Sequence, residues 1–475
     1  MTYLYLLLIS VFYTILFYGK KKGLSVLIFT VVLLIFTKKY LKKENIELNK
    51  KFYIYMIPII LLSATYMIFD NQVFNFLNYF GIILLYNYMI ISNTSKNNII
   101  QTKILNSISL CFSTIRNSFK SFRECRSYIN NKSNFKSKKI HKYIKSIFIT
   151  IIVLTIIISL LATSDQIFGS MFNNLFSFVN NINNIILQDW FFKLIYMFII
   201  FLLLLGLFYS IKNIKIKNSN FKVPKSDNLT IKMILISLNI IYLIFCIIQI
   251  KSLFFRSLPA NYVYSTYARR GFFQLLFVSI INIILILYIK SNIRENKTIN
   301  ILNLLMIIFN YIIIFSSIYR MYLYEQAFGY TYLRLLVYCF LVYEIIILIP
   351  TIFYVFDKKI DLLNTYFIIF IIWYVTINYM NFDYIIAYNN VERYLNNRNS
   401  EIDVSYLINN VGSGGVDNIL KLDGKVDDID KLMIKEYKNT IKTNYSKDIR
   451  EFNISNYHAY KKVSRFKWFF RIDSI

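Results

Sequence analysis

Hydrophobic residues are gathered into eleven blocks along the chain, most of them about 17–24 residues long, with short polar or charged segments between them. The blocks lie near 2–18, 24–37, 52–69, 72–92, 147–163, 189–211, 231–250, 272–289, 299–318, 335–356 and 364–380. About 20 apolar residues cross the ~30 Å hydrocarbon layer as a helix. A helix satisfies all of its own backbone hydrogen bonds, which a single segment surrounded by lipid must do because no water is present. The pattern predicts an all-α polytopic transmembrane bundle of about 11 spans, with a small helical C-terminal extramembrane region.

The polar segments predict an orientation, because short cytoplasmic loops collect Lys and Arg. Segment 93–146 carries twelve basic residues and a single acid, Glu124. Alternation then also puts 38–51 and 212–230 inside, the amino terminus inside and the carboxyl-terminal tail outside. Two basic segments disagree with this topology, Lys20–Lys22 and 251–271. Four segments follow: an N-terminal four-span segment (1–92), a basic cytoplasmic loop (93–146), a seven-span core (147–380) and a C-terminal helical tail (381–475).

The basic loop and the tail carry helical patterns of their own. In the loop, apolar residues recur at spacings of three and four: Ile100, Ile104, Ile108, Cys111, Phe112, Ile115, Phe119 and Phe122. A basic helix of this kind is typical of a surface on anionic lipid, with a partner-protein helix as the alternative. In the tail, the last span is expected to continue through "NFDYIIAYNNVERYLNN", Asp403 to cap a short helix, and "GSGG" (412–415) to form a flexible break. A further amphipathic helix is predicted from Ile429, Leu432, Met433, Tyr437 and Ile441.

Charge and composition remove several function classes. The net charge of +29 suggests nucleic acid at first sight, but nearly all of the excess lies in the membrane part and the tail is almost neutral. We therefore expect no nucleic-acid partner. Four cysteines without C-x-x-C spacing and two distant histidines predict no disulfide framework, no metal site and no cofactor.

Glu344 is the sharpest single candidate for chemistry. It lies ten residues after Arg334, about 15 Å along a helix and so near the bilayer centre. An ionisable residue there usually faces the bundle interior or a water-filled path, so Glu344 is a candidate proton or cation site. The alternative is a structural acid paired with Arg or Tyr on a neighbouring helix. Mid-span amides (Asn239, Gln249, Asn282 and Asn310) are interpreted as contacts between helices, and Pro58 and Pro350 are expected to bend their spans.

Two arginine- and tyrosine-rich segments fall on the same predicted outer face, each beside a span. The first motif contains Tyr267, Arg269, Arg270 and Gly271; the second contains Arg320, Tyr324, Glu325, Gly329 and Arg334. Interfacial tyrosines and snorkelling arginines explain part of this pattern. The positive-inside rule nevertheless disfavours two outside arginines, so a pairing of Glu325 with Arg269 or Arg270 is expected, in an outer cap or an anion-binding mouth.

Five separated motifs carry a resemblance to a known family. They are "LFYGKKKGLSVLIF", "YSTYARRGFFQLLFVSIINIILIL", "YRMYLYEQAFGYTYLR", "NFDYIIAYNNVER" and "REFNISNYHAY". In this order they resemble a bacterial integral membrane family, the domain of unknown function numbered four-one-seven-three. The resemblance implies a membrane architecture in the bacterial cell envelope, at the cytoplasmic membrane, and supplies no catalytic residues to carry over.

Three functional hypotheses remain open. The first is an envelope sensor, scaffold or regulatory protein, with membrane lipids as partners and an envelope protein bound through the tail. The second is a proton- or cation-coupled transporter that uses Glu344. The third is an envelope-lipid-modifying enzyme that uses Asp383, Glu325 and Arg270; we expect that the protein is not an enzyme.

Overall fold

The fold is known from a computed structural model, which describes residues 2–95, 99–132, 184–214, 228–249, 272–292, 296–357, 360–396 and 401–465. These residues form sixteen α-helices and no β-strand. The all-α prediction is therefore confirmed for the described part of the chain.

Ten apolar helices coincide with ten of the eleven predicted spans. They are α1 (Thr2–Phe17), α2 (Leu24–Lys43), α3 (Lys50–Ile68), α4 (Gln72–Thr94), α8 (Asn184–Lys212), α9 (Asn228–Gln249), α11 (Phe272–Asn292), α12 (Lys297–Phe328), α13 (Tyr332–Phe356) and α14 (Leu362–Tyr379). Eight helices in the described residues are long and apolar enough to cross a membrane, and α1 and α11 supply shorter apolar stretches. The predicted span at 147–163 lies outside the described residues.

The chain divides into two compact units. The first contains Met1–Lys21, Ile35–Ile46 and Leu105–Ile216, and the second contains Lys22–Leu34, Glu47–Ile104 and Lys217–Ile475. These units cut across the four segments that the sequence predicts, and those segment boundaries stay a prediction.

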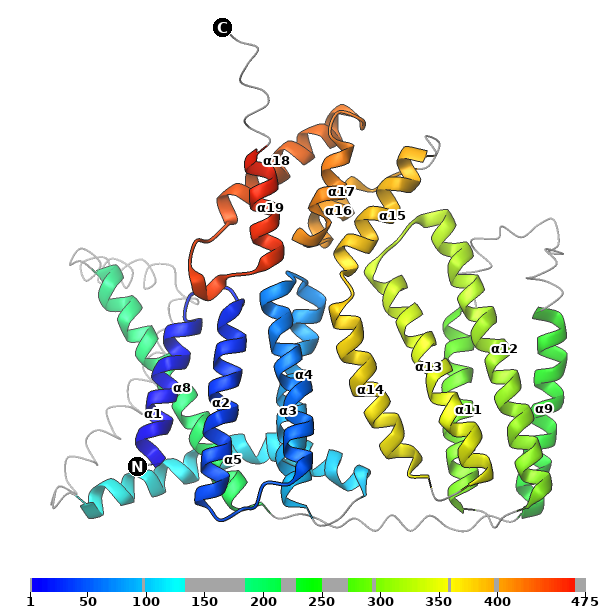
Figure 1. Cartoon of the computed structure of the whole chain (residues 1–475), viewed down its shortest axis with the longest axis horizontal. Helices are drawn as coiled ribbons and strands as arrows, with labels where there is room; N and C mark the ends of the chain where they lie inside the picture. The colour runs from blue at the N-terminus through cyan, green and yellow to red at the C-terminus, as the bar shows by residue number, and fades with distance from the viewer. Residues whose placement is uncertain are drawn as a thin grey trace, which may run out of the picture. The chain divides into compact units, whose positions relative to one another are not determined.

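In the first unit, α1 packs along α8, and the amphipathic helix α5 (Ile100–Lys132) runs across α8 instead of along it (Figure 1). A Cβ atom added at Gly206 of α8 would lie 2.2 Å from the backbone oxygen of Thr114 in α5. The Asn117 amide also donates to Ser210 Oγ at 3.1 Å. Glycine thus allows the two helix backbones to approach each other closely.

The second unit is built around a cluster of four helices, α9, α11, α12 and α13. Its buried apolar core joins residues from each of them, among them Leu235, Ile286, Met306 and Leu341. Beside this cluster α14 packs against α13 on one side and against the α3–α4 pair on the other. A hydrogen bond links α4 to α14, because the Asn78 side chain donates to Asn378 at 2.7 Å.

The C-terminal helices are stacked at one end of the spans of the second unit (Figure 1). They are α15 (Phe382–Asn396), α16 (Val404–Asn410), η2 (Ser413–Gly415), α17 (Val416–Ile419), η3 (Leu420–Leu422), α18 (Asp428–Asn444), η4 (Ile449–Glu451) and α19 (Ile454–Arg465). Their apolar core is continuous with that of the spans, since Phe382, Ile386 and Leu407 cluster with Phe74 of α4 and Tyr332 of α13.

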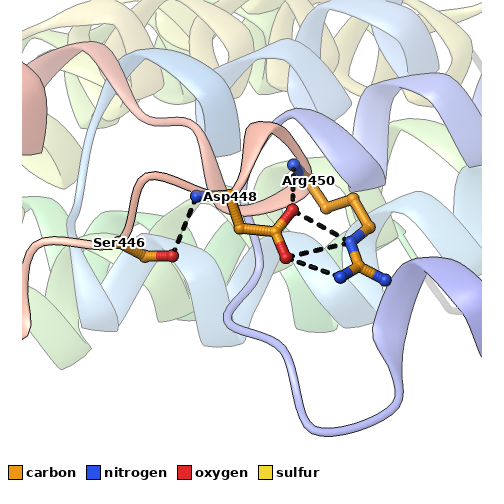
Figure 2. A network of polar contacts seen from close by, with 3 residues as sticks. All are labelled: Ser446, Asp448 and Arg450. Carbon is orange, nitrogen blue, oxygen red and sulfur yellow. Dashed lines mark hydrogen bonds and ion pairs between the residues drawn. The ribbon is translucent and has the colours of Figure 1, made fainter.

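A hydrogen-bonded loop attaches this region to the start of α2. Asp448 accepts from the backbone and the guanidinium of Arg450, and Ser446 Oγ accepts from the Asp448 amide at 3.2 Å (Figure 2). The loop so shaped presents the carbonyl of Phe452, which accepts from the Leu24 amide at 3.0 Å.

Two predictions for the tail are wrong, and one is confirmed. The last span does not continue through 381–397, because α14 ends before Met380 and the Asn381 side chain begins α15 by accepting from the Tyr384 amide at 3.1 Å. The "GSGG" segment is a packed turn, not a flexible break, since a Cβ at Gly412 would lie 2.2 Å from the Asp70 carbonyl oxygen. Asp403 caps α16 as expected, accepting from the Tyr406 amide at 2.8 Å.

Candidate functional site

Glu344 lies in the interior of the α9–α11–α12–α13 cluster. Its side chain is 1% exposed, and both carboxylate oxygens accept from Ser279 Oγ of α11, at 2.8 and 2.9 Å. Ser279 is its sole hydrogen-bond partner among the described residues, and no cationic side chain pairs with it there. The alternative of a structural acid paired with Arg or Tyr has no support among the described residues, and it stays open for the rest of the chain.

Amide side chains extend the polar contacts of Glu344 across three helices. Asn310 of α12 donates to the Ser279 carbonyl at 3.4 Å and accepts from Asn282 of α11 at 3.1 Å. Asn282 in turn accepts from the hydroxyl of Tyr242 in α9 at 2.6 Å. Two amides that the sequence interprets as contacts between helices therefore belong to the same cluster as the candidate acid.

Buried polar side chains continue along α12 in both directions from this cluster. They are Asn303, Asn310, Ser316, Ser317, Arg320 and Glu325, each no more than 5% exposed. At 1.5 Å per residue, Asn303 and Glu325 are separated by ~33 Å along the axis, close to the ~30 Å thickness of a bilayer core. We call these six residues the polar stripe of α12.

The polar stripe contains groups that the described part of the protein leaves without a partner. Neither side-chain amide atom of Asn303 has a hydrogen-bond partner there, although Asn303 is fully buried. Arg320 and Ser316 both donate to Gln249 Oε1 of α9, at 2.9 and 3.0 Å. The amide of Asn239 on α9 donates to the Leu302 carbonyl at 3.1 Å, next to Asn303.

Glu325 ends the stripe beside a large cavity. One carboxylate oxygen accepts from the Tyr338 hydroxyl at 2.9 Å, and the other is buried with no partner among the described residues. The cavity is wide and open to the surface, and residues of α12, α13 and α15 line it, chiefly with apolar and tyrosine side chains. Tyr338 also lies on α13, six residues or ~9 Å along the axis before Glu344.

The turn between α12 and α13 gathers three more residues of the second motif. The Arg334 guanidinium lies 4.4 Å from the centre of the Tyr324 ring and donates to the carbonyls of Phe328 and Gly329. Gly329 has φ +77°, a conformation that favours glycine. A Cβ there would also meet Asn390 Oδ1 of α15 at 2.4 Å. The turn is thus held closely against the C-terminal region.

The first motif cannot be compared with this arrangement. Tyr267, Arg269, Arg270 and Gly271 lie outside the described residues. The expected pairing of Glu325 with Arg269 or Arg270 therefore stays a prediction. Within the second motif, Tyr324, Glu325, Gly329 and Arg334 come together at the helix turn, whereas Arg320 contacts α9 deeper in the bundle.

Sequence reasoning missed four residues of these sites. Ser279 and Tyr338 carry no pattern that separates them from other serines and tyrosines of the spans. Asn390 donates to the Tyr330 carbonyl and accepts from its amide, and Arg393 donates to the Gln326 carbonyl at 3.1 Å. Both belong to the "NFDYIIAYNNVER" motif, so that motif was the available signal for them. Burial, followed by the charge of Arg334, lowers the pKa of Arg393.

Asp383 occupies a separate buried site where the spans meet the C-terminal region. It is 1% exposed, and its carboxylate accepts from the Gly412 amide at 2.9 Å. Burial raises the pKa of this carboxyl to about 7, against the opposing effect of the Gly412 bond, and nearby Asp70 adds to the rise. Asp383 lines a small cavity between α4 and α15 that is different from the one beside Glu325. The two acids of the enzyme hypothesis therefore do not share a cavity.

Comparison with known proteins identifies a family for most of the chain. The sequence model of the domain of unknown function DUF4153 matches residues 56–422. The number four-one-seven-three, suggested by the resemblance of the motifs, is thereby corrected. The comparison with curated proteins and the comparison with solved structures gave no match. Since the matched residues make up well over half of its length, the protein belongs to the DUF4153 family of domains of unknown function.

Proposed function

We propose that the protein is a proton- or cation-coupled membrane transporter whose coupling site is Glu344. The observation that carries this proposal is the polar stripe of α12, which extends over roughly the thickness of a bilayer core and meets a buried acid near its middle. A helix that only has to pack in lipid does not require such a stripe, because polar side chains at that depth are costly and concentrate on substrate and ion pathways.

The surroundings of Glu344 suit a site that binds and releases a cation. A buried carboxylate beside one hydroxyl has little to stabilise its charge, so a bound proton or small cation is needed to neutralise it. The hydroxyl of Ser279 supplies a neutral oxygen close by, which is a suitable additional ligand for a hydrated cation. A permanently paired arginine would have fixed the charge and abolished this exchange.

A proline inside α13 removes one backbone hydrogen bond close to Glu344, which would make this part of the helix easier to bend. Pro350 lies inside the helix and cannot donate to the Ile346 carbonyl, two residues after Glu344. The Tyr311 hydroxyl of α12 donates to the neighbouring Ile345 carbonyl at 3.3 Å. Transporters use local weakening of a span beside a central site to open that site to one side and then to the other.

Glu325 supports an entrance at the predicted outer face. Glu325 and Tyr338 both line the cavity, and Tyr338 lies ~9 Å along α13 from Glu344. In this proposal Glu325 attracts the cation, and Glu344 binds it at mid-depth. The location in a bacterial cytoplasmic membrane, with the amino terminus inside and the tail outside, belongs to the same proposal.

The test is flux through the purified full-length chain in liposomes that contain a pH-sensitive dye. We expect wild-type protein to move protons under an imposed membrane potential, and Glu344→Gln to reduce the rate at least tenfold with normal reconstitution. Asp428→Asn, the same chemical change at a fully exposed tail position, is the matched control and should leave the rate unchanged. Equal rates for Glu344→Gln and wild type would refute the coupling role of Glu344.

A sensor or scaffold role is the second candidate, and the packing of the tail favours it. The Asn390–Tyr330 contacts and the close approach of Gly412 to the Asp70 carbonyl join the C-terminal region closely to the span ends, so a ligand bound to the tail would act on the spans directly. In this case, removing residues 401–475 should abolish the cellular function, while Glu344→Gln should have little effect. The transporter proposal predicts the reverse for Glu344→Gln.

A further inference from the structure

A long groove lies between α3 and α14 in the second unit, away from the polar stripe. Its wall is mainly aliphatic, with Ile54, Ile57, Pro58, Ile368, Ile372 and Val375 along it. Ile54, Ile57 and Ile372 are 58–61% exposed, as expected for side chains that face lipid. The lining residues extend from Asp361 to Thr376, ~22 Å along α14, which exceeds the ~15 Å depth of one hydrocarbon leaflet.

One end of the groove is charged. Lys51 at the start of α3, Lys103 of α5 and Asp361 before α14 line it there, beside the phenol of Tyr55. Lys103 is 5% exposed, and burial, followed by the charge of the adjoining Lys51, lowers its pKa, whereas Asp361 acts in the opposite direction. Two ammonium groups therefore lie side by side with one carboxylate, and an anion that bridges them would relieve their repulsion.

We propose that this groove is a binding site for an anionic membrane phospholipid, whose phosphate contacts Lys51 and Lys103 while one acyl chain lies between α3 and α14. The charge complementarity selects the head group, and the aliphatic wall that begins at the lysines selects a lipid over a free phosphate ion. All three charged residues lie in or beside segments that the positive-inside rule assigns to the cytoplasmic side, where the leaflet is rich in anionic lipid. The site is independent of the transport proposal, since none of its residues belongs to the polar stripe.

The proposal differs from simple adsorption of a basic loop. Lys103 belongs to the helix whose basic face is predicted to lie on anionic lipid, yet its side chain is buried and is directed toward α3 and α14. If the loop only adsorbed to anionic lipid, the strength of lipid binding would depend on the total charge of the loop. The groove instead depends on two specific lysines and on free space between two spans.

The experiment is native mass spectrometry of the full chain in detergent with phosphatidylglycerol, phosphatidylcholine or inorganic phosphate. Lys51→Gln/Lys103→Gln removes the head-group contacts, and Ile372→Trp fills the groove while it leaves both lysines in place. Lys39→Gln/Lys50→Gln removes the same charge from exposed positions at the same predicted side and is the matched control. Size-exclusion profiles and thermal melting establish that each variant is folded.

We expect phosphatidylglycerol to bind wild type and the control equally, and to bind Lys51→Gln/Lys103→Gln about thirtyfold more weakly, at ~1 kcal/mol per lysine. Ile372→Trp should lose the lipid as well. Equal binding of phosphatidylglycerol by the double variant and the control would overturn the proposal. So would binding of phosphate alone together with unchanged lipid binding by Ile372→Trp, which would identify a free-anion site.

Discussion

At the scale of single residues, Glu344 and Asp383 show how differently the protein stabilises two buried acids. Glu344 has one hydroxyl as its partner inside the spans, whereas Asp383 accepts from a backbone amide at their end. Tyr437 of α18 is also affected by Asp383, since burial and then the charges of Asp383 and Asp70 raise the pKa of its phenol.

The stability of the folded protein should decrease with pH through the titration of Asp383. Its pKa rises from 3.8 to about 7 on folding, so the folded state binds more protons than the unfolded state between these values. Stability is then highest below about pH 4 and is lost progressively up to about pH 7. Asp383→Asn keeps an oxygen that can accept from the Gly412 amide and removes the titration.

Melting temperatures in detergent at pH 5 and pH 8 test this expectation. Wild type should lose more stability between the two values than Asp383→Asn, whereas the exposed Asp428→Asn should behave as wild type. An equally large loss in Asp383→Asn would assign the pH dependence to other groups.

At the scale of helices, α5 is packed by its small polar face and not by its apolar face. Ser107, Ser118, Ser121 and Cys125 are buried, whereas Phe112, Ile115 and Phe119 are 61–71% exposed. This is the arrangement expected of a helix that presents its apolar face to lipid. The close crossing with α8 depends on Gly206, a contact that no sequence pattern signals.

Gly206→Ala should destabilise the first unit, because the new methyl group would meet the Thr114 carbonyl oxygen at 2.2 Å and separate α5 from α8. We expect a loss of ~1–3 kcal/mol, typical of overpacking. The matched control is Gly81→Ala in α4, where the added Cβ meets Tyr374 at an ordinary 3.6 Å. That change should be neutral or stabilising by up to ~1 kcal/mol. Thermal unfolding of the two variants measures this difference. Equal stability of Gly206→Ala and Gly81→Ala would contradict the close crossing of α5 and α8.

The sequence is informative for helices because long apolar runs and caps are local signals. Ten spans and the Asp403 cap follow from such signals, as does the placement of Glu344 inside the bundle. The break between α14 and α15 was missed because one asparagine cap interrupts an otherwise continuous helical pattern. The packed turn at Gly412 was missed because close contact with the Asp70 carbonyl depends on tertiary structure. In α18 the predicted apolar face is divided, with Ile429 75% exposed and Leu432 65% exposed.

The candidate site could be predicted only in part for the same reason. The position of Glu344 in an apolar run indicates a buried acid, and Asn282 and Asn310 stand out as polar residues in the spans. Their meeting with Ser279 depends on the rotation of α11 and α12 about their axes, which periodicity does not determine when a helix is apolar on most sides. Asn303 was passed over because a single asparagine near a helix start resembles ordinary capping sequence.

At the scale of the whole second unit, the C-terminal region and the start of α2 lie at the same end of the spans, since the Leu24 amide donates to the Phe452 carbonyl. The predicted topology assigns both to the outer side. Lys20–Lys22, which argues against this topology, immediately precedes the contact. The packing thus agrees with an even number of spans between the two segments, as in the ten predicted from 24–37 to 364–380.

Labelling with a membrane-impermeant maleimide tests the orientation in intact cells. We expect Asp428→Cys, at a fully exposed position of the tail, to react from outside. Asn45→Cys, in the predicted inner loop after α2, should react only after the membrane is opened. The reversed pattern would invert the whole topology without a change in the span count, whereas reaction of both residues from the same side would change the span count by one.

The bond between Leu24 and Phe452 also has a consequence for biosynthesis. More than 400 residues separate the two partners, and a ribosome adds ~5–20 residues per second. The beginning of α2 is therefore synthesised tens of seconds before Phe452, and the later spans are made in between. During that interval the Leu24 amide lacks its native acceptor, and a chain truncated before residue 452 never forms this bond.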